Sequence, residues 1–151
     1  MKAIVKHLID KDLKIAVAES MTGGNISASI TKHANASKVF KGAIIAYTKE
    51  VKVSVLKIDE NLIDKHSSVS LEVLEAMNNG LKELIDANIY ISTTGNAGPS
   101  FELNSNELMC YILVDYEGSK HYRVVKFESS KRFKNIKRAT NEVVSILREI
   151  I

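Results

Sequence analysis

Ala18-Glu19-Ser20-Met21-Thr22-Gly23-Gly24 is the stretch around which the rest of the chain is organised. It follows a short apolar run at residues 13–17, typical of a buried strand, and precedes residues 25–33, which can form a helix. Backbone N–H groups at a helix N-terminus attract anions, and glycine keeps side chains away from such a ligand. Two interpretations stay open from this stretch alone. Either Ser20 or Thr22 merely caps the helix, or Ser20 takes part in chemistry.

The composition is that of an ordinary globular protein. With 151 residues, 45% hydrophobic and 26% charged, the chain suits one domain with a sizeable core. The net charge of +3 and the scattered lysines argue against a nucleic-acid partner. The absence of a signal-peptide pattern and of a long apolar segment predicts a cytoplasmic protein without membrane contact. The single cysteine, Cys110, lies in an apolar run and is expected to be a small core residue.

Hydrophobic periodicity predicts helices that alternate with strands, followed by a β-hairpin. Thr48 and Ser70 are expected to cap two of the helices. The expected helices are 2–11, 22–33, 49–56, 59–65, 68–86 and 131–151, and the expected strands are 14–18, 39–47, 87–94, 107–116 and 120–128. This order predicts an α/β fold, a three-layer α/β/α single domain over residues 1–151 with a mixed β-sheet.

Tyr47 and Lys52 form a second candidate cluster, because they follow the second strand. If that strand is a neighbour of the first, both residues lie near Ser20. A lysine can activate a serine when burial or a nearby cation keeps it neutral, and Tyr47 could then relay the proton or hold the lysine in place. The alternative is that Lys52 is a solvated helix lysine and that Tyr47 packs at a strand end.

Two further segments are candidates for ligand binding. Residues 93–99 end a strand and hold the only proline, and their backbone could receive a phosphate or another polar group, unless they form a plain tight turn. Basic residues also gather at the start of the last helix, where one or two could reach a phosphate or simply face solvent. They are Lys131, Arg132, Lys134, Lys137 and Arg138. The four histidines show no metal-ligand spacing, so no metal site is expected.

Together these segments resemble the CinA C-terminal domain family, whose characterised enzymes are nicotinamide mononucleotide deamidases. The family pattern Ala-Glu-Ser-Cys-Thr-Gly-Gly is matched by residues 18–24, with Met21 in place of the cysteine. Its Gly-x-x-x-Ser/Thr-Tyr-Ser-Asn-x-x-Lys is matched by residues 42–52, which keep Tyr47 and Lys52. Its Gly-Ala-Val-Ser is echoed at residues 67–70, and its Thr-Gly-Ile-Ala-Gly-Pro is matched by residues 94–99, with Asn96 for isoleucine.

The resemblance implies an amidohydrolase that converts the carboxamide of nicotinamide mononucleotide to the acid and releases ammonia, without a metal or other cofactor. Ser20 would be the nucleophile, Lys52 the general base and Tyr47 a helper in the proton path. The resemblance implies that the backbone amides of Thr22, Gly23 and Gly24 stabilise the oxyanion. The substrate-binding residues would be Thr22, Gly23, Gly24, Thr94, Gly95, Ala97, Gly98, Lys131 and Arg132. The expected partner is thus a small pyridine nucleotide, and exposed apolar positions after Ser70 favour a homo-oligomer.

The chain departs from the family on the side expected to hold the substrate. The family's Pro-Glu-Lys-Pro-Val-Gly segment is replaced within residues 100–109, and its Gly-Asp-Arg has become residues 129–132, Ser-Ser-Lys-Arg. These departures support an alternative hypothesis, a catalytically inactive or altered-specificity relative that binds a nucleotide or a protein partner. A third is a structural oligomerisation domain.

Overall fold

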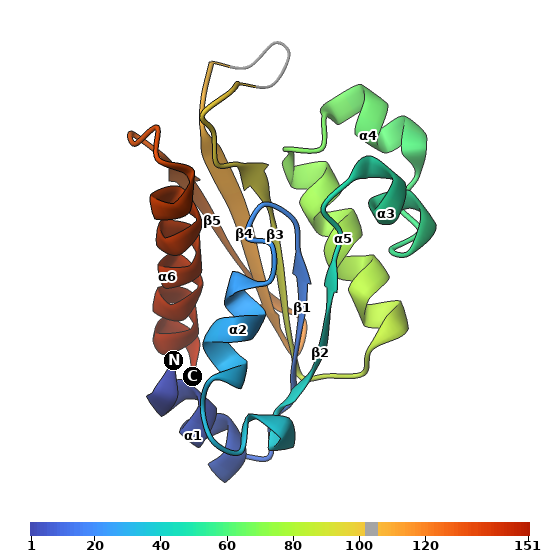
Figure 1. Cartoon of the computed structure of the whole chain (residues 1–151). Coiled ribbons are helices and arrows are strands. Elements are labelled where there is room, and N and C mark those ends of the chain that lie inside the picture. Colours follow the sequence, from blue (N-terminus) through green and yellow to red (C-terminus); the bar gives the residue numbers. More distant parts are fainter. Residues whose placement is uncertain (102–105) are drawn as a thin grey trace.

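A mixed five-stranded sheet lies at the centre of the computed structural model, which describes residues 1–101 and 106–151. The strand order is β2-β1-β3-β4-β5. Strands β2, β1 and β3 are parallel to one another, whereas β4 runs antiparallel to both of its neighbours, β3 and β5 (Figure 1). The strands are β1 (Ile15–Glu19), β2 (Phe40–Ile45), β3 (Ile89–Asn96), β4 (Met109–Tyr116) and β5 (Ser119–Lys126). The sequence-based expectation of a mixed sheet with a late hairpin is confirmed.

Helices cover both faces of this sheet and complete three layers (Figure 1). One face packs against α1 (Lys2–Asp10), α2 (Asn25–Thr31) and α6 (Arg132–Ile150), and the other against α3 (Lys49–Ser54), α4 (Glu60–His66) and α5 (Leu71–Leu84). A short 3₁₀ helix, η1 (Ala36–Lys38), precedes β2.

The interior strand β1, which lies between β2 and β3, shows why the two faces differ. Its side chains alternate between the faces, as in any strand. Ile15 and Val17 belong to the core beneath α1, α2 and α6, whereas Ala16 and Ala18 belong to the core beneath α5. All four are fully buried, as expected for an interior strand of a sheet with both faces covered.

Two expected helices begin three residues later than the sequence pattern indicates, and the reasons are local. Gly23 and Gly24 have φ angles of 55° and 96°, so residues 22–24 form a turn and α2 starts at Asn25 rather than residue 22. The side chain of Ser70 accepts a hydrogen bond from Val73 N, which places the start of α5 at Leu71. Thr48 caps α3 in the same way and confirms that prediction.

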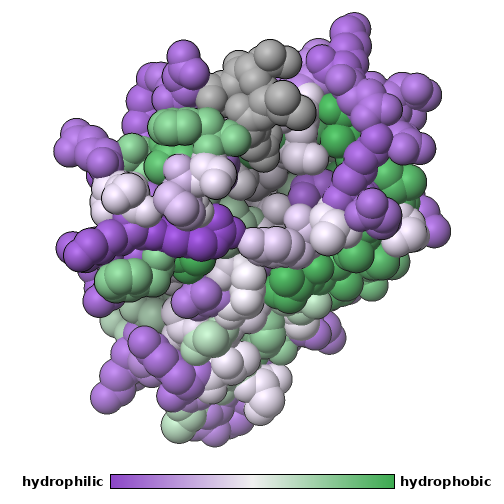
Figure 2. Space-filling model, turned by 45° about the horizontal axis from the view of Figure 1, so that its top comes forward, coloured by the Kyte–Doolittle hydropathy of each residue, from purple (hydrophilic) through white to green (hydrophobic). Residues whose placement is uncertain are grey.

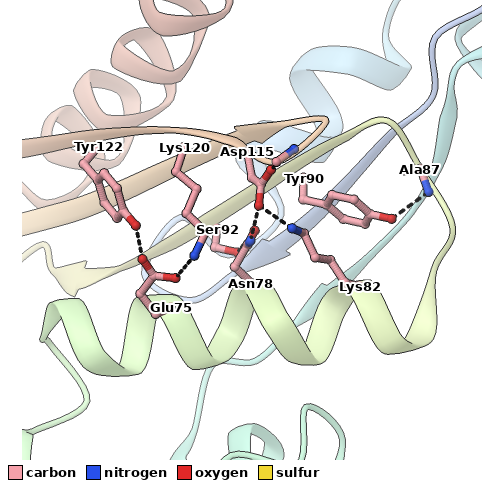
Figure 3. Close-up of polar contacts among 10 residues, drawn as sticks. Glu75, Asn78, Lys82, Ala87, Tyr90, Ser92, Asp115, Lys120 and Tyr122 are labelled. Carbon is pink, nitrogen blue, oxygen red and sulfur yellow. Dashed lines mark hydrogen bonds and ion pairs between the residues drawn. The ribbon is translucent and has the colours of Figure 1, made fainter.

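The sheet also holds α5 through a buried polar cluster, which we call the Asp115 cluster (Figure 3). Asp115 on β4 accepts hydrogen bonds from Asn78 Nδ2 at 3.0 Å and from Lys82, both on α5, and from Gly118 N at 2.9 Å. Ser92 on β3 completes the cluster by donating to Asn78 Oδ1 at 3.4 Å. Burial raises the pKa of the Asp115 carboxyl, but the hydrogen bonds from Lys82, Gly118 and Asn78 outweigh it and leave the pKa below its ordinary value.

Candidate functional site

Ser20, Tyr47 and Lys52 meet at the carboxyl end of the parallel strands. Ser20 directly follows β1, and Lys52 lies on α3, which follows β2. The sequence predicted that Tyr47 and Lys52 lie near Ser20 if the first two strands are neighbours. Strands β1 and β2 are hydrogen-bonded neighbours, so this condition is met. Figure 2 brings this end of the molecule forward. Neutral and hydrophilic residues surround the centre of this face, and hydrophobic residues form separate patches beside it.

The side chains of Ser20 and Lys52 are in direct contact inside the protein. Lys52 Nζ lies 3.0 Å from Ser20 Oγ and donates to the carbonyl oxygen of Ala46 at 2.8 Å. Lys52 is 1% exposed and Ser20 6% exposed, so Lys52 is not a solvated helix lysine. Burial disfavours the charged form of an amine, and a neutral amine at this distance can accept the serine proton.

Glu19, not Ser20 or Thr22, holds the N-terminus of α2. The carboxylate of Glu19 accepts hydrogen bonds from Gly24 N at 3.0 Å and Ile26 N at 3.1 Å, and from Ser27 N at 2.9 Å and Ser27 Oγ at 2.6 Å. Glu19 is fully buried, and its charge is satisfied by the positive end of the helix. The interpretation of Ser20 or Thr22 as the cap is therefore wrong. Ser20 instead points to Lys52, and the hydroxyl of Thr22 pairs with that of Thr93.

These contacts also change which backbone amides can receive an oxyanion. Gly24 N donates to Glu19, and Gly23 N donates to the carbonyl oxygen of Ser20 at 3.0 Å. Both amides are thus engaged, contrary to the expectation for Gly23 and Gly24. Within the described residues, the N–H groups of Met21 and Thr22 have no such acceptor. Thr22 is fully buried, whereas Met21 adjoins the pocket beside Ser20, so the amide of Met21 is the one left for a ligand oxygen.

Tyr47 and Arg132 meet across the site. Arg132, at the start of α6, donates to the hydroxyl of Tyr47 at 2.6 Å and to the carbonyl oxygen of Gly98 at 2.6 Å. The Tyr47 side chain is half-exposed and its hydroxyl is turned to Arg132, not to Ser20 or Lys52. A proton-relay role for Tyr47 would require it to change partner. In this structure Tyr47 forms part of the wall.

The segment predicted to bind substrate at the end of β3 is largely structural. The hydroxyl of Thr94 donates to the carbonyl oxygen of Ser68 at 2.6 Å, and the carbonyl oxygen of Ala97 accepts from Asn135 at 3.0 Å. A side chain at Gly95 would lie 2.3 Å from the carbonyl oxygen of Met109, so the antiparallel pairing with β4 requires glycine there. Asn135 is a structural partner of this segment that the sequence did not predict. It is a buried side chain on α6 with no motif to mark it.

A pocket of about 220 Å³ opens beside the Ser20–Lys52 pair. Six predicted site residues line it, together with four that were not predicted. The lining consists of Ser20, Met21, Tyr47, Lys52, Ser68, Val69, Thr94, Gly95, Asn96 and Arg132. The other predicted binding residues do not line this pocket: Thr22, Gly23, Gly24, Ala97, Gly98 and Lys131.

The rewritten segment at residues 100–109 falls partly outside the description, since residues 102–105 are not among those the structure describes. In the rest of the chain, no cluster of three or more His, Cys, Asp or Glu side chains could hold a metal ion. No helix within the described ranges has the length and apolar character needed to cross a membrane. Cys110 is buried in β4, as expected, and burial raises the pKa of its thiol strongly.

Comparison with known proteins shows which family the chain belongs to. A model of the CinA C-terminal domain matches residues 1–151. A CinA-like protein of Flavobacterium psychrophilum is 37% identical over 143 residues, which cover 94% of this chain and 34% of that protein. A CinA-like protein of Thermotoga maritima is 40% identical over 99 residues, which cover 66% of this chain and 24% of that protein. The chain therefore spans about a third or less of the length of these relatives.

Solved structures show the same fold. The competence damage-inducible protein A of Klebsiella pneumoniae superimposes with a TM-score of 0.92 at 24% identity, covering 99% of this chain and 93% of that one. A competence/damage inducible protein of Agrobacterium tumefaciens gives a TM-score of 0.86 at 20% identity, covering 97% and 94%. At these identities the likeness concerns the fold.

Proposed function

Because the chain belongs to the CinA C-terminal domain family, we propose that it is an amidohydrolase with Ser20 as nucleophile and Lys52 as general base. The proposed substrate is nicotinamide mononucleotide, whose carboxamide would be hydrolysed to the acid with release of ammonia. One observation carries the proposal, the 3.0 Å contact between Lys52 Nζ and Ser20 Oγ beside an open pocket. The spacing is within the reach required for proton transfer between a nucleophile and its base.

The first half-reaction forms an acyl-enzyme. Lys52, as a neutral amine, accepts the proton of Ser20 while Ser20 Oγ attacks the carboxamide carbon. The backbone N–H group of Met21, which lines the pocket, is the proposed donor to the oxyanion, in place of those of Gly23 and Gly24. The ammonium of Lys52 then returns its proton to the departing nitrogen, and ammonia leaves.

The second half-reaction releases the acid. Lys52 takes a proton from a water molecule, the resulting hydroxide attacks the ester carbon, and the proton returns to Ser20 Oγ. The hydrogen bond to the carbonyl oxygen of Ala46 keeps Nζ oriented through both steps. The positive charge of a pyridinium ring would also favour the neutral form of Lys52.

The size of the pocket fits the reacting end of this substrate. A volume of about 220 Å³ is smaller than the ~300–1,000 Å³ typical of sites that enclose a whole ligand. We therefore place the pyridine ring and its carboxamide in the pocket and the ribose phosphate outside it. Arg132, at the rim, is the proposed phosphate partner, since guanidinium groups suit phosphate geometry.

Ammonia release from nicotinamide mononucleotide tests the proposal. The wild-type protein should release ammonia, and Ser20→Ala should abolish the release, lowering the rate by about 10³-fold or more, while the melting temperature stays close to that of the wild type. Ser29→Ala, which removes an α2 hydroxyl outside the pocket, is the matched control and should keep full activity. A wild-type protein that shows a thermal shift with this nucleotide but no turnover would instead support the non-catalytic alternative.

A further inference from the structure

The largest groove among the pockets described has no role in the proposed reaction. It encloses about 660 Å³ between α2 and α6, which lie side by side in Figure 1. It shares no lining residue with the pocket at Ser20. Its walls are Met1, Asn25, Ala28, Ser29, Lys32, Phe133, Lys137, Thr140, Asn141, Val144 and Arg148.

The charge of this groove has one sign. Lys32, Lys137 and Arg148 line it, and no aspartate or glutamate does. Within residues 1–101 and 106–151 none of these three cations forms an ion pair, whereas Arg123 on β5 pairs with two acids. Those acids, Glu142 and Glu149, are the only ones on α6. Of its charged side chains, helix α6 thus presents the two carboxylates to β5 and only cations to the groove.

One of these cations also affects the residue that follows it in the chain. The pKa of His33, which follows Lys32, lies below its ordinary value, first because of burial and then because of the Lys32 charge. Cations gathered without counter-charges raise the local concentration of anions. The positive charge of the groove therefore favours a ligand that carries several negative charges.

An aromatic side chain stands at one end of the same groove. Phe133 is 67% exposed, although burying a phenyl ring is normally favourable. It lies one helical turn from Lys137 and about 22 Å along the helix axis from Arg148. An exposed ring next to a row of cations can stack on a flat base while the cations hold phosphates.

We propose that the groove between α2 and α6 is a second binding site, for a nucleoside polyphosphate. The base stacks on Phe133, and the phosphates lie along Lys137, Lys32 and Arg148. The volume falls in the range of small-molecule sites, and the low net charge of +3 argues against a nucleic-acid strand as the occupant. This site is independent of amide hydrolysis at Ser20.

Equilibrium binding of ATP, measured by isothermal titration calorimetry without added metal, tests the phosphate contacts. ATP should bind to the wild-type protein, and the triple variant Lys32→Gln, Lys137→Gln, Arg148→Gln should weaken binding more than about tenfold. The control is Lys41→Gln, Lys57→Gln, Lys65→Gln, which removes the same charge from exposed positions outside the groove and should leave the affinity unchanged. Equal loss in both triple variants, or no binding of ATP, would overturn the proposal.

Inorganic tripolyphosphate and Phe133→Ala test the aromatic contact. Tripolyphosphate should bind more weakly than ATP, and Phe133→Ala should weaken ATP several-fold without affecting tripolyphosphate. If the two probes bind equally to the wild type and to Phe133→Ala, the site is not one for nucleotides. ATP binding that persists in the groove triple variant but competes with nicotinamide mononucleotide would assign ATP to the Ser20 pocket and also refute the proposal.

Discussion

Two buried polar clusters lie at opposite ends of the same sheet, and they differ in what surrounds them. In the Asp115 cluster, at the amino end of β3, the carboxylate accepts from Asn78, Lys82 and Gly118, so it is satisfied by the protein (Figure 3). The Ser20–Lys52 pair, at the carboxyl end of β1, adjoins a pocket of about 220 Å³. Buried polar groups with protein partners fix a structure, whereas similar groups beside open space are placed to act on a ligand.

We expect loss of charge to lower activity at the Ser20–Lys52 pair and to lower the free energy of unfolding at the Asp115 cluster. Lys52→Met keeps most of the side-chain volume and removes the amine, so activity on nicotinamide mononucleotide should fall by about 10³-fold or more. Stability should change by no more than about 1 kcal/mol, because the gain from replacing a buried amine with an apolar side chain offsets the loss of its hydrogen bond to the carbonyl oxygen of Ala46. Ammonia release and urea unfolding measure the two effects. A large loss of stability with activity retained would contradict the comparison.

The Asp115 cluster should show the reverse. Asp115→Ala leaves the buried amide of Asn78 without its acceptor and should lower the free energy of unfolding by about 2–3 kcal/mol, with activity per folded molecule unchanged. The matched control is Glu75→Ala, which removes a partly exposed ion pair with Lys120 that also joins α5 to β5. It should cost no more than about 1 kcal/mol in urea unfolding. Equal costs for the two variants would mean that burial is not the cause.

Glu19 belongs to both comparisons, since it is a buried carboxylate satisfied by the protein and it directly precedes Ser20, the proposed nucleophile. Glu19→Gln exchanges an acceptor oxygen for an NH₂ group that faces backbone N–H donors, and it should lower the free energy of unfolding by about 1–2 kcal/mol. Activity should also fall, because the turn that holds Ser20 depends on this contact. Thermal unfolding and steady-state rates of the same preparations check both expectations. Loss of stability with an unchanged rate would separate Glu19 from the site.

The pH dependence of stability tests the smallest of these effects, the contribution of the Asp115 charge to the free energy of unfolding. The Asp115 pKa is lower in the folded state than in the unfolded chain, so the unfolded state takes up the proton first as the pH falls. The resulting stabilisation is complete above the unfolded-state pKa of about 3.9 and is lost as the pH falls through the lower folded-state value. The unfolding free energy should therefore fall less steeply below about pH 4 in Asp115→Asn than in the wild type. Parallel pH curves would show that Asp115 does not contribute.

The sequence determined much of the fold, because helices and strands depend on apolar patterns and caps formed by residues close together in the chain. The apolar pattern of residues 14–18 and 68–86, and the caps at Thr48 and Ser70, led to strands and helices in the right order. It missed the start of α2, because a helical apolar pattern does not reveal that Gly23 and Gly24 adopt positive φ. The motif resemblance brought out Ser20, Tyr47 and Lys52, which the fold then gathered around one pocket.

What only the tertiary structure decided is which group meets which. A carboxylate at Glu19 can cap a helix or face a ligand, and its use as the α2 cap depends on the turn at residues 21–24, which brings the start of α2 back to Glu19. Tyr47 and Arg132 are 85 residues apart, and their contact exists only because α6 packs on one face of the sheet with its first residue at the carboxyl end of the parallel strands. Side-chain type and spacing set what chemistry a residue can perform. The packing of distant segments sets its partners, because hydrogen bonds and burial depend on positions in space and not on separation along the chain.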